Sequence, residues 1–400
     1  MRKDWEYKKL GECFHYIKNG ANIKQVKGAG GYPITRIETL SGGVFNRNRM
    51  GYADVYDIEK YQDYILENGD LLLSHINSKS YIGRTVEYRS RNTEIIIHGM
   101  NLLRIKNNSD VISSSFFAYY ANSHKFKSDI ARIRKDAVNQ SSLSITDLKK
   151  IHVPLPPKPT QLAIVAELDK INELIQLKKQ QLKDYDQLAQ SIFYEMFGDP
   201  VENEKGWEVK KLGGICSKIG SGATPKGGNN SYKDTGISLI RSLNVHNNLF
   251  KYEDLAHIDD SQATALNNVI VKEKDILLNI TGASVARCCI VPNDVLPARV
   301  NQHVCIIRIA NESDSFYLNR LFTNDSYQSK LLALSKSKAA TREALPKTIV
   351  ESLSVPLPPL PLQQQFAARI EAIERQKQQV SETIKDLETL LASRMQYWFD

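Results

Sequence analysis

An internal repeat constrains this chain more than any other feature, because two copies of one unit must each fold in the same way. The opening segment WEYKKLG at Trp5–Gly11 returns as WEVKKLG at Trp207–Gly213, 202 positions later. The segment VPLPP at Val153–Pro157 returns at Val355–Pro359 with the same offset. A constant offset between anchors this far apart predicts two tandem units with the same order of elements.

Weaker matches between the anchors support the same alignment. Gln161 pairs with Gln363, and Phe197 with Phe399, at the offset of 202. Between the opening and Pro-rich segments the match drifts by a few residues: GDLLL at Gly69–Leu73 resembles KDILL at Lys274–Leu278, and NLLRI at Asn101–Ile105 resembles CIIRI at Cys305–Ile309.

The stretches between the anchors have the mixed character of α/β or α+β domains. Short apolar, β-branched runs bounded by Gly and Asn predict strands at Pro33–Ile37, Gly69–Leu73, Glu94–Ile97 and Leu102–Ile105, and at Ser238–Arg241, Asp275–Ile280 and Val304–Ile309. Helices are expected near Ser114–Ile133 and Ser315–Leu334. We therefore predict globular domains at 1–157 and 200–359, each followed by a spacer helix, at 158–199 and 360–400.

The two predicted spacer helices carry heptad-like apolar stripes. Thr160–Met196 contains no Gly or Pro and is rich in good helix formers. The stripe positions expected to pack between helices are Leu168, Ile171, Ile175, Leu182, Tyr185, Ile370, Ile373, Val380, Ile384 and Leu387. A helix of about 35 residues is roughly 50 Å long and needs a partner for its stripe.

The second helix is the obvious partner of the first. The expected result is two domains joined by an antiparallel coiled-coil pair with pseudo-twofold symmetry. The alternative is that each helix packs only on its own domain.

Composition narrows the class of protein. Hydrophobic residues make up 42% and charged residues 24%, as in ordinary globular proteins. The first ten residues have no apolar core of a signal peptide, and no apolar run is long enough to cross a membrane, which favours a cytoplasmic protein. Five cysteines without CxxC spacing argue against a zinc site or a disulfide framework. The net charge of +8 favours a polyanionic partner.

Two similar domains held apart by a rigid spacer suit a long, periodic ligand such as DNA, whose successive turns present equivalent faces about 34 Å apart. The order of Trp5–Gly11, Gly69–Leu72, Val153–Pro157, Gln161–Leu188 and Met196–Pro200 resembles that of Type I restriction-modification specificity subunits. The resemblance covers essentially the whole chain, twice. The second copy departs from it in having Lys274-Asp275 for Gly-Asp and in lacking the Gly-Asp-Pro continuation after Phe399.

The resemblance implies a sequence-specific, non-catalytic subunit that reads a bipartite, gapped target in double-stranded DNA. It implies two modification subunits that methylate adenine with S-adenosylmethionine, and restriction subunits that use ATP and Mg²⁺. No cofactor, metal or membrane is expected for this chain itself.

The motifs of the partner enzymes are not found in this sequence. The only Pro-Pro pairs, Pro156-Pro157 and Pro358-Pro359, follow Leu rather than the Asn or Asp of an adenine methyltransferase motif. Gly220–Gly228 does not fit the GxxxxGK[ST] pattern of a P-loop. The alternative functions left open are a coiled-coil adaptor and a specificity module of another modification enzyme.

Polar loops after the predicted strands supply the candidate DNA-reading residues, since base edges are read by Arg, Lys, Asn, Gln, Ser and Thr side chains. In the first domain they are Arg36, Asn77, Ser78, Lys79, Arg84, Asn139, Gln140 and Ser141. In the second they are Arg241, Asn244, Thr281, Ser284, Arg287, Asn301, Gln302, His303, Thr341 and Arg342. The alternative for each is a solvated loop residue or a local turn cap.

Overall fold

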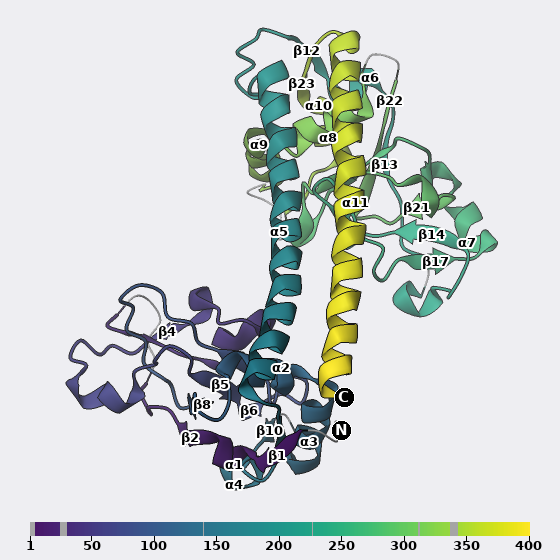
Figure 1. Cartoon of the computed structure of the whole chain (residues 1–400). Coiled ribbons are helices and arrows are strands. Elements are labelled where there is room, and N and C mark those ends of the chain that lie inside the picture. The colour runs from purple at the N-terminus through teal and green to yellow at the C-terminus, as the bar shows by residue number, and fades with distance from the viewer. Residues whose placement is uncertain (1–4, 25–29, 139, 226, 311–312, 337–342) are drawn as a thin grey trace. The chain divides into compact units, whose positions relative to one another are not determined.

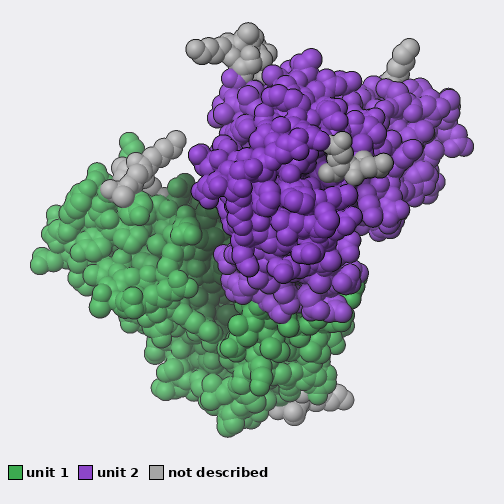
Figure 2. Space-filling view, turned by 90° about the horizontal axis from the view of Figure 1, so that it is seen from above, with its two compact units in different colours: residues 1–179, 382–400 green, residues 180–381 purple. Residues whose placement is uncertain are grey.

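The structure is a computed structural model that describes residues 5–24, 30–138, 140–225, 227–310, 313–336 and 343–400 (Figure 1). The chain divides into two compact units, shown in different colours in Figure 2. Unit 1 comprises residues 1–179 and 382–400, and unit 2 comprises residues 180–381. Both boundaries fall inside long helices, α5 (Lys158–Phe197) and α11 (Leu360–Phe399), so each unit contains a segment of each long helix.

The repeated anchors form the same small sheet in both units. In unit 1, β1 (Glu6–Lys9) pairs antiparallel with β11 (His152–Leu155), so the opening segment binds the Pro-rich segment. In unit 2, β12 (Glu208–Lys211) pairs with β23 (Ser354–Leu357). Even the register repeats, because Glu6 faces Leu155 and Glu208 faces Leu357. In each unit the repeated motifs are therefore two paired strands that join the opening segment to the Pro-rich segment.

A four-stranded antiparallel sheet is also duplicated. Its order in unit 1 is β2 (Phe14–Asn19), β8 (Leu102–Asn107), β5 (Leu71–Ser74) and β7 (Thr85–Glu87). The order in unit 2 is β13 (Cys216–Ser221), β22 (Val304–Ile309), β19 (Ile276–Asn279) and β20 (Cys288–Ile290). The sheets are mostly antiparallel, so each unit is α+β rather than a doubly wound α/β domain.

The second sheet differs between the copies. Unit 2 has four strands in the order β17 (Ala256–Ile258), β14 (Ile237–Ile240), β21 (Ala298–Val300) and β18 (Ile270–Val271), with β14 and β21 parallel. Unit 1 has β3 (Pro33–Ile34) with β4 (Gly51–Tyr52), and Ile97 makes only isolated bridges, to Ile34 and Ile65. The predicted strand Glu94–Ile97 was therefore wrong, and Pro33–Ile37 was too long because the 3-10 helix η1 (Ile37–Gly43) begins at Ile37.

Each predicted helical stretch after the central strands is two helices. Ser114–Ile133 is divided into α2 (Ser114–Asn122) and α3 (His124–Ile133), and Ser315–Leu334 into α8 (Ser315–Phe322) and α9 (Asp325–Ser335). Ser123 is extended and accepts a hydrogen bond from Phe126 N–H, so it caps the second helix rather than continuing the first. Shorter helices complete the units: α1 (Leu10–Cys13), α4 (Ile145–Leu148), α6 (Leu212–Ile215), α7 (Asp260–Ala265) and α10 (Lys347–Ser352).

The repeated Gln residues tie the Pro-rich segments to the helices. Both side chains are almost completely buried. The Gln161 amide donates to Pro156 O at 3.0 Å and accepts from Ser113 N–H, next to the start of α2. Gln363 donates to Pro358 O at 2.7 Å and accepts from Asp314 N–H, next to the start of α8. Each Gln thus links two segments that are about 50 residues apart in sequence.

The long helices contact each other within each unit. In unit 1, Arg394 pairs with Glu167, and Lys179 Nζ lies 2.8 Å from Glu388. From the first pair to the second, the residue number increases along α5 and decreases along α11. The two helical segments therefore run antiparallel. In unit 2, Lys377 Nζ lies 2.7 Å from Asp186.

The predicted stripe is largely buried. Seven of its positions are in the core, whereas Leu182, Tyr185 and Leu387 are half-buried. Leu168 belongs to the core of unit 1, and Ile370 and Ile373 to that of unit 2, so part of each stripe packs on the domain itself. Among the described residues, no helix is apolar enough over a sufficient length to cross a membrane.

Glu94 is held after a turn by donors from three residues rather than in a strand. Its carboxylate accepts from Arg47 Nε at 2.8 Å, Tyr88 Oη at 3.1 Å and Arg91 N–H at 2.8 Å. The hydrogen bond from Arg47 is the main cause that lowers the pKa of Glu94 to about 2.

We expect Glu94→Gln to lower the free energy of unfolding by about 2 kcal/mol at pH 7. Because the folded pKa is depressed, this contribution is complete above the unfolded pKa of about 4.3 and fades as the pH falls towards 2. Urea denaturation of both proteins between pH 7 and pH 3 measures it, with the exposed Glu59→Gln as control. A difference that does not change with pH would contradict the assignment.

Candidate nucleic-acid interface

A small three-stranded sheet places several predicted residues together in unit 1. Its order is β6 (Ile76–Asn77), β10 (Ser141–Ser142) and β9 (Lys135–Asp136), and Asn77 lies opposite Ser141. Asn77 Nδ2 donates to Ser74 Oγ at 3.1 Å, and its Oδ1 accepts from Ser78 N–H at 2.7 Å. These contacts fix the turn from which Ser78 and Lys79 extend into solvent.

A basic pocket of about 390 Å³ lies beside this sheet. Its lining carries four cationic side chains and no carboxylate, and we refer to it as the basic pocket. The lining residues are Gly42, Gly43, Lys79, Ser80, Tyr81, Ile82, Gly83, Arg84, Asn122, Lys127, Ile130 and Arg134. A concave surface with this charge suits a phosphate group, which Lys and Arg bind in nucleic-acid complexes.

The cations of the basic pocket are positioned by neighbouring groups. Arg84 Nη1 donates to Leu40 O at 3.2 Å, and its guanidinium stacks over Tyr81, 4.6 Å from the ring centre. Arg134 Nε lies 3.0 Å and Lys79 Nζ 3.8 Å from Asp136. A hydrogen bond from Ser141 is the main cause that lowers the pKa of Asp136, so this carboxylate is ionised at neutral pH and orients both cations.

Gly42 and Gly43 also line the basic pocket. Their φ values are 71° and 74°, in the left-handed region that glycine adopts without strain. A Cβ atom at either position would meet no other heavy atom within 4 Å. The backbone at these two glycines is therefore open to close approach by a ligand.

Not every predicted residue of the first domain lies here. Asn77 and Ser141 lie in the sheet, Lys79 and Arg84 line the pocket, Ser78 directly follows β6, and Gln140 directly precedes β10. Arg36 is exposed but pairs with Glu38 at 3.6 Å and is not among the lining residues. The Ser141 side chain is buried and donates to Asp136, so it orients the site rather than facing a ligand. Asn139 lies outside the described residues.

Unit 2 carries three of its candidates on the equivalent loop. In unit 1 the loop joins β5 to β7, and in unit 2 Thr281, Ser284 and Arg287 lie on the loop that joins β19 to β20. Thr281 Oγ1 and His303 Nδ1 are 2.6 Å apart, and Gln302 Nε2 lies 3.2 Å from His303 Nε2. Thr281 also forms a bridge with Ala344, as Ile76 does with Ser142 in unit 1. Thr341 and Arg342 lie outside the described residues.

Three predicted residues of unit 2 are structural instead. Asn244 is completely buried, accepts from Arg241 N–H and donates to Lys251 O at 2.9 Å, so its amide holds a loop together. Asn301 is buried and accepts from His303 N–H at 3.0 Å. The Arg241 guanidinium stacks over Tyr232 and donates to Asp254 O. Asn244 and Asn301 are both buried, so their amides hold loops in this structure, and contact of these side chains with DNA stays a prediction.

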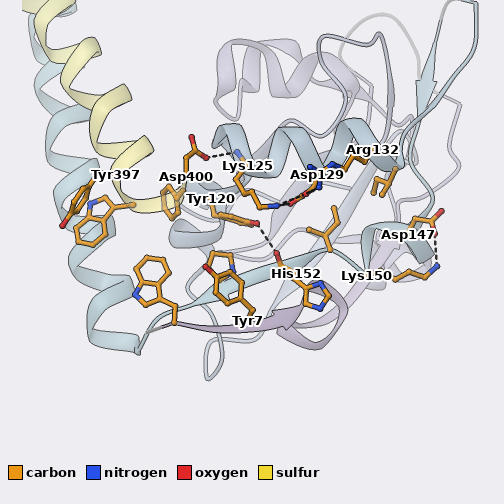
Figure 3. Close-up of a pocket in the computed structure, with 16 residues that line it drawn as sticks. Tyr7, Tyr120, Lys125, Asp129, Arg132, Asp147, Lys150, His152, Tyr397 and Asp400 are labelled. Carbon is orange, nitrogen blue, oxygen red and sulfur yellow. Dashed lines mark hydrogen bonds and ion pairs between the residues drawn. The ribbon is translucent and has the colours of Figure 1, made fainter. Parts of the chain in front are cut away.

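A larger pocket of unit 1, about 810 Å³, lies where α11 ends (Figure 3). Aromatic side chains line it, and Figure 3 shows Tyr120 donating to His152 O, at 3.2 Å. Its cations are matched by carboxylates: Lys125 pairs with Asp129 at 2.7 Å, and Lys150 with Asp147 at 3.0 Å. A pocket with balanced charges is a poorer phosphate site than the smaller basic pocket.

Sequence reasoning missed Lys127 and Arg134 of the basic pocket. Both come from α3 or its C-terminal end, whereas the candidates were sought only in loops after strands. A usable signal was present, because four cations, Lys125, Lys127, Arg132 and Arg134, occur within ten residues. Within the described residues no group of His, Cys, Asp and Glu is arranged to hold a metal ion.

Comparison with known proteins agrees with these features. A family model described as Type I restriction modification DNA specificity domain matches residues 2–184 and 204–389. The putative type I restriction enzyme MjaX specificity subunit of Methanocaldococcus jannaschii is 30% identical, over 97% of this chain and 93% of its own. The MjaIX specificity subunit of the same organism is 24% identical, over 93% of this chain and 87% of its own.

Two solved structures share the fold. The S subunit of a Type I restriction-modification system from M. genitalium has a TM-score of 0.55 at 13% identity, covering 98% of this chain and 95% of its own. A chain from a structural study of complex assembly and conformational transition of the type I R-M system has a TM-score of 0.58 at 17% identity, covering 100% and 98%. At these identities the likeness concerns the fold alone.

Proposed function

Because the chain belongs to the Type I restriction-modification DNA specificity family and carries the family domain twice, we propose that each unit reads one half of a bipartite, gapped DNA target. The chain is a specificity subunit of a Type I restriction-modification system. One observation carries the proposal: the loop between equivalent strands of the duplicated sheet bears several of the polar candidates in both units, Asn77–Lys79 and Arg84 in unit 1 and Thr281, Ser284 and Arg287 in unit 2. The two units share the same sheet but carry different loop residues, and this suits recognition of two different half-sites.

In unit 1 the cations of the basic pocket bind neighbouring phosphates of the duplex, and the turn at Asn77–Lys79 approaches base edges. Phosphate contacts fix the register of a protein on DNA, while contacts to base edges in the groove supply sequence information. In unit 2 the cluster of Thr281, Gln302 and His303 has the corresponding role. Polar side chains joined by hydrogen bonds, as these are, present a fixed pattern of donors and acceptors.

The gap between the half-sites is set by α5 and α11 acting as an antiparallel coiled-coil spacer. Ion pairs between the helices, such as Lys179 with Glu388 and Lys377 with Asp186, support this assignment. Adding residues to such a spacer changes the separation of the half-sites without changing the bases that are read.

Chemistry on the DNA belongs to partner proteins in this proposal. Two modification subunits methylate adenine with S-adenosylmethionine, and restriction subunits use ATP and Mg²⁺. The chain itself supplies double-stranded DNA recognition and docking, and takes no cofactor. An adaptor without DNA affinity and a module of another modification enzyme are the competing functions.

The test is a binding assay with the chain purified together with its modification subunits. We expect selection from a random duplex library to enrich a gapped, asymmetric sequence, with affinity that falls steeply as salt rises. Enrichment of no sequence by a complex that is intact by native mass spectrometry would reject the specificity function. Failure to form that complex, with DNA binding retained, would favour a module that acts with another enzyme.

A further inference from the structure

The β9–β10 hairpin of unit 1 ends in an unusually exposed apolar residue. Val138 is 99% exposed, more than any other large hydrophobic residue described. The turn is closed by a hydrogen bond of 2.8 Å from Ala137 N–H to Gln140 O. Below it, Ser141 pairs with both Asp136 and Asn77, so the hairpin rests on a third strand. The position of Val138 is therefore supported by the three-stranded sheet from which the hairpin extends.

Single exposed apolar residues are common and mean little alone. What distinguishes Val138 is the chain immediately before it. Arg134, four residues earlier, lines the basic pocket, and Lys79 of the same pocket lies 3.8 Å from Asp136 at the foot of the hairpin. The apolar tip thus projects from the rim of a site that suits a DNA phosphate.

The reach of the β9–β10 hairpin is comparable to the depth of the DNA major groove. An extended chain rises about 3.3 Å per residue, so the two residues from Asp136 to Val138 reach roughly 7 Å, and the valine side chain extends further. The major groove of B-DNA is about 8.5 Å deep and about 12 Å wide, and admits a two-stranded ribbon. A duplex with its phosphate in the basic pocket therefore has the floor of its major groove within reach of Val138.

We propose that Val138 reads the methyl group of one thymine in the half-site bound by unit 1, an inference that rests on the proposed function. The thymine C5-methyl is the apolar feature that the major groove presents to a side chain. Valine is β-branched and therefore stiff, so little rotamer freedom is lost on contact. Side chains that wedge between base steps of the minor groove are mostly larger, such as Phe, Leu, Ile or Met.

The repeat makes this contact particular to the first half-site. Aligning Leu143 with Leu345 at the offset of 202 places Ala340 opposite Val138 in the sequence. Ala340 lies outside the described residues. The shorter side chain at this position implies different reading in the second half-site.

The experiment uses the chain in complex with its modification subunits and the enriched duplex. Each thymine of the first half-site is replaced in turn by uracil, which removes the methyl group and keeps the pairing face. We expect one uracil substitution to weaken binding about fourfold, the effect of losing one buried methyl group. Val138→Ala should weaken binding to the thymine duplex by a similar factor and abolish the response to that uracil.

Val209→Ala is the matched control, since Val209 is an exposed valine on β12 of unit 2. It should bind like the wild type and keep the uracil response. Equal uracil responses in wild type and Val138→Ala, no responsive thymine, or a first half-site without an A·T pair would each overturn the proposal. These results differ from failure of the proposed function, in which the wild-type complex prefers no duplex and both inferences fall.

Discussion

Asp275→Asn is expected to lower the free energy of unfolding by about 3 kcal/mol, because it removes the buried carboxylate that pairs with the half-buried Arg308 guanidinium. The Asp275 side chain is completely buried and accepts from Arg308 Nε at 2.8 Å and Nη2 at 2.6 Å. It also accepts from Lys272 N–H at 2.7 Å. The same pair exists in unit 1, where Asp70 lies 2.7 Å from Arg104.

Urea denaturation followed by circular dichroism measures this effect, with the exposed Asp184→Asn as control, which should change stability by less than about 0.5 kcal/mol. The double variant Asp275→Asn/Arg308→Met should lose less stability than the sum of its single variants, because no charge is then left unpaired. If the free energy of unfolding of Asp275→Asn lies within about 1 kcal/mol of the wild-type value, the ion pair does not hold the sheet together.

The second large effect concerns DNA. We expect Lys79→Ala/Lys127→Ala/Arg134→Ala to weaken binding of the complex several hundredfold at about 0.1 M salt, since each lost phosphate contact costs roughly eightfold there. The slope of log K against log salt should become shallower by about 2.7, because three contacts are lost. Fluorescence anisotropy across a salt series measures both quantities.

The matched control removes the same charge elsewhere in unit 1. Arg132→Ala/Lys149→Ala/Lys150→Ala takes three cations from outside the basic pocket, and Arg132 and Lys150 line the charge-balanced pocket of Figure 3. It should keep most of the affinity and nearly the original slope. Equal losses in the two triple variants would show that net charge, rather than the basic pocket, attracts the DNA.

The repeated motifs predicted the duplicated elements of the fold well, because each motif has a structural role in both units. The opening and Pro-rich segments pair as strands, and Gln161 and Gln363 join the same two elements in both units. The matching Gly-Asp and Lys-Asp segments contain the acids of the buried ion pairs. Gly69 and Lys274 both have positive φ, which explains why glycine suits this position.

The candidate site was harder to predict. A polar residue in a loop has the same appearance in the sequence whether it faces solvent or holds the loop, and Asn244 does the latter. Lys127 and Arg134 meet Lys79 and Arg84 only through tertiary packing of α3 beside the loop after β5. The division of Ser114–Ile133 at Ser123 had a readable cause, since serine favours helix caps over helix interiors.

The most direct test is a map of N6-methyladenine, made by single-molecule sequencing of cells that express the modification subunits with this chain. A second strain carries a chain in which residues 1–157, the predicted first domain, come from another member of the family. We expect one gapped, asymmetric methylated motif, of which only one half changes in the second strain while the gap length stays the same. A motif that is identical in both strains, or that changes in both halves, would contradict the assignment of one half-site to each unit.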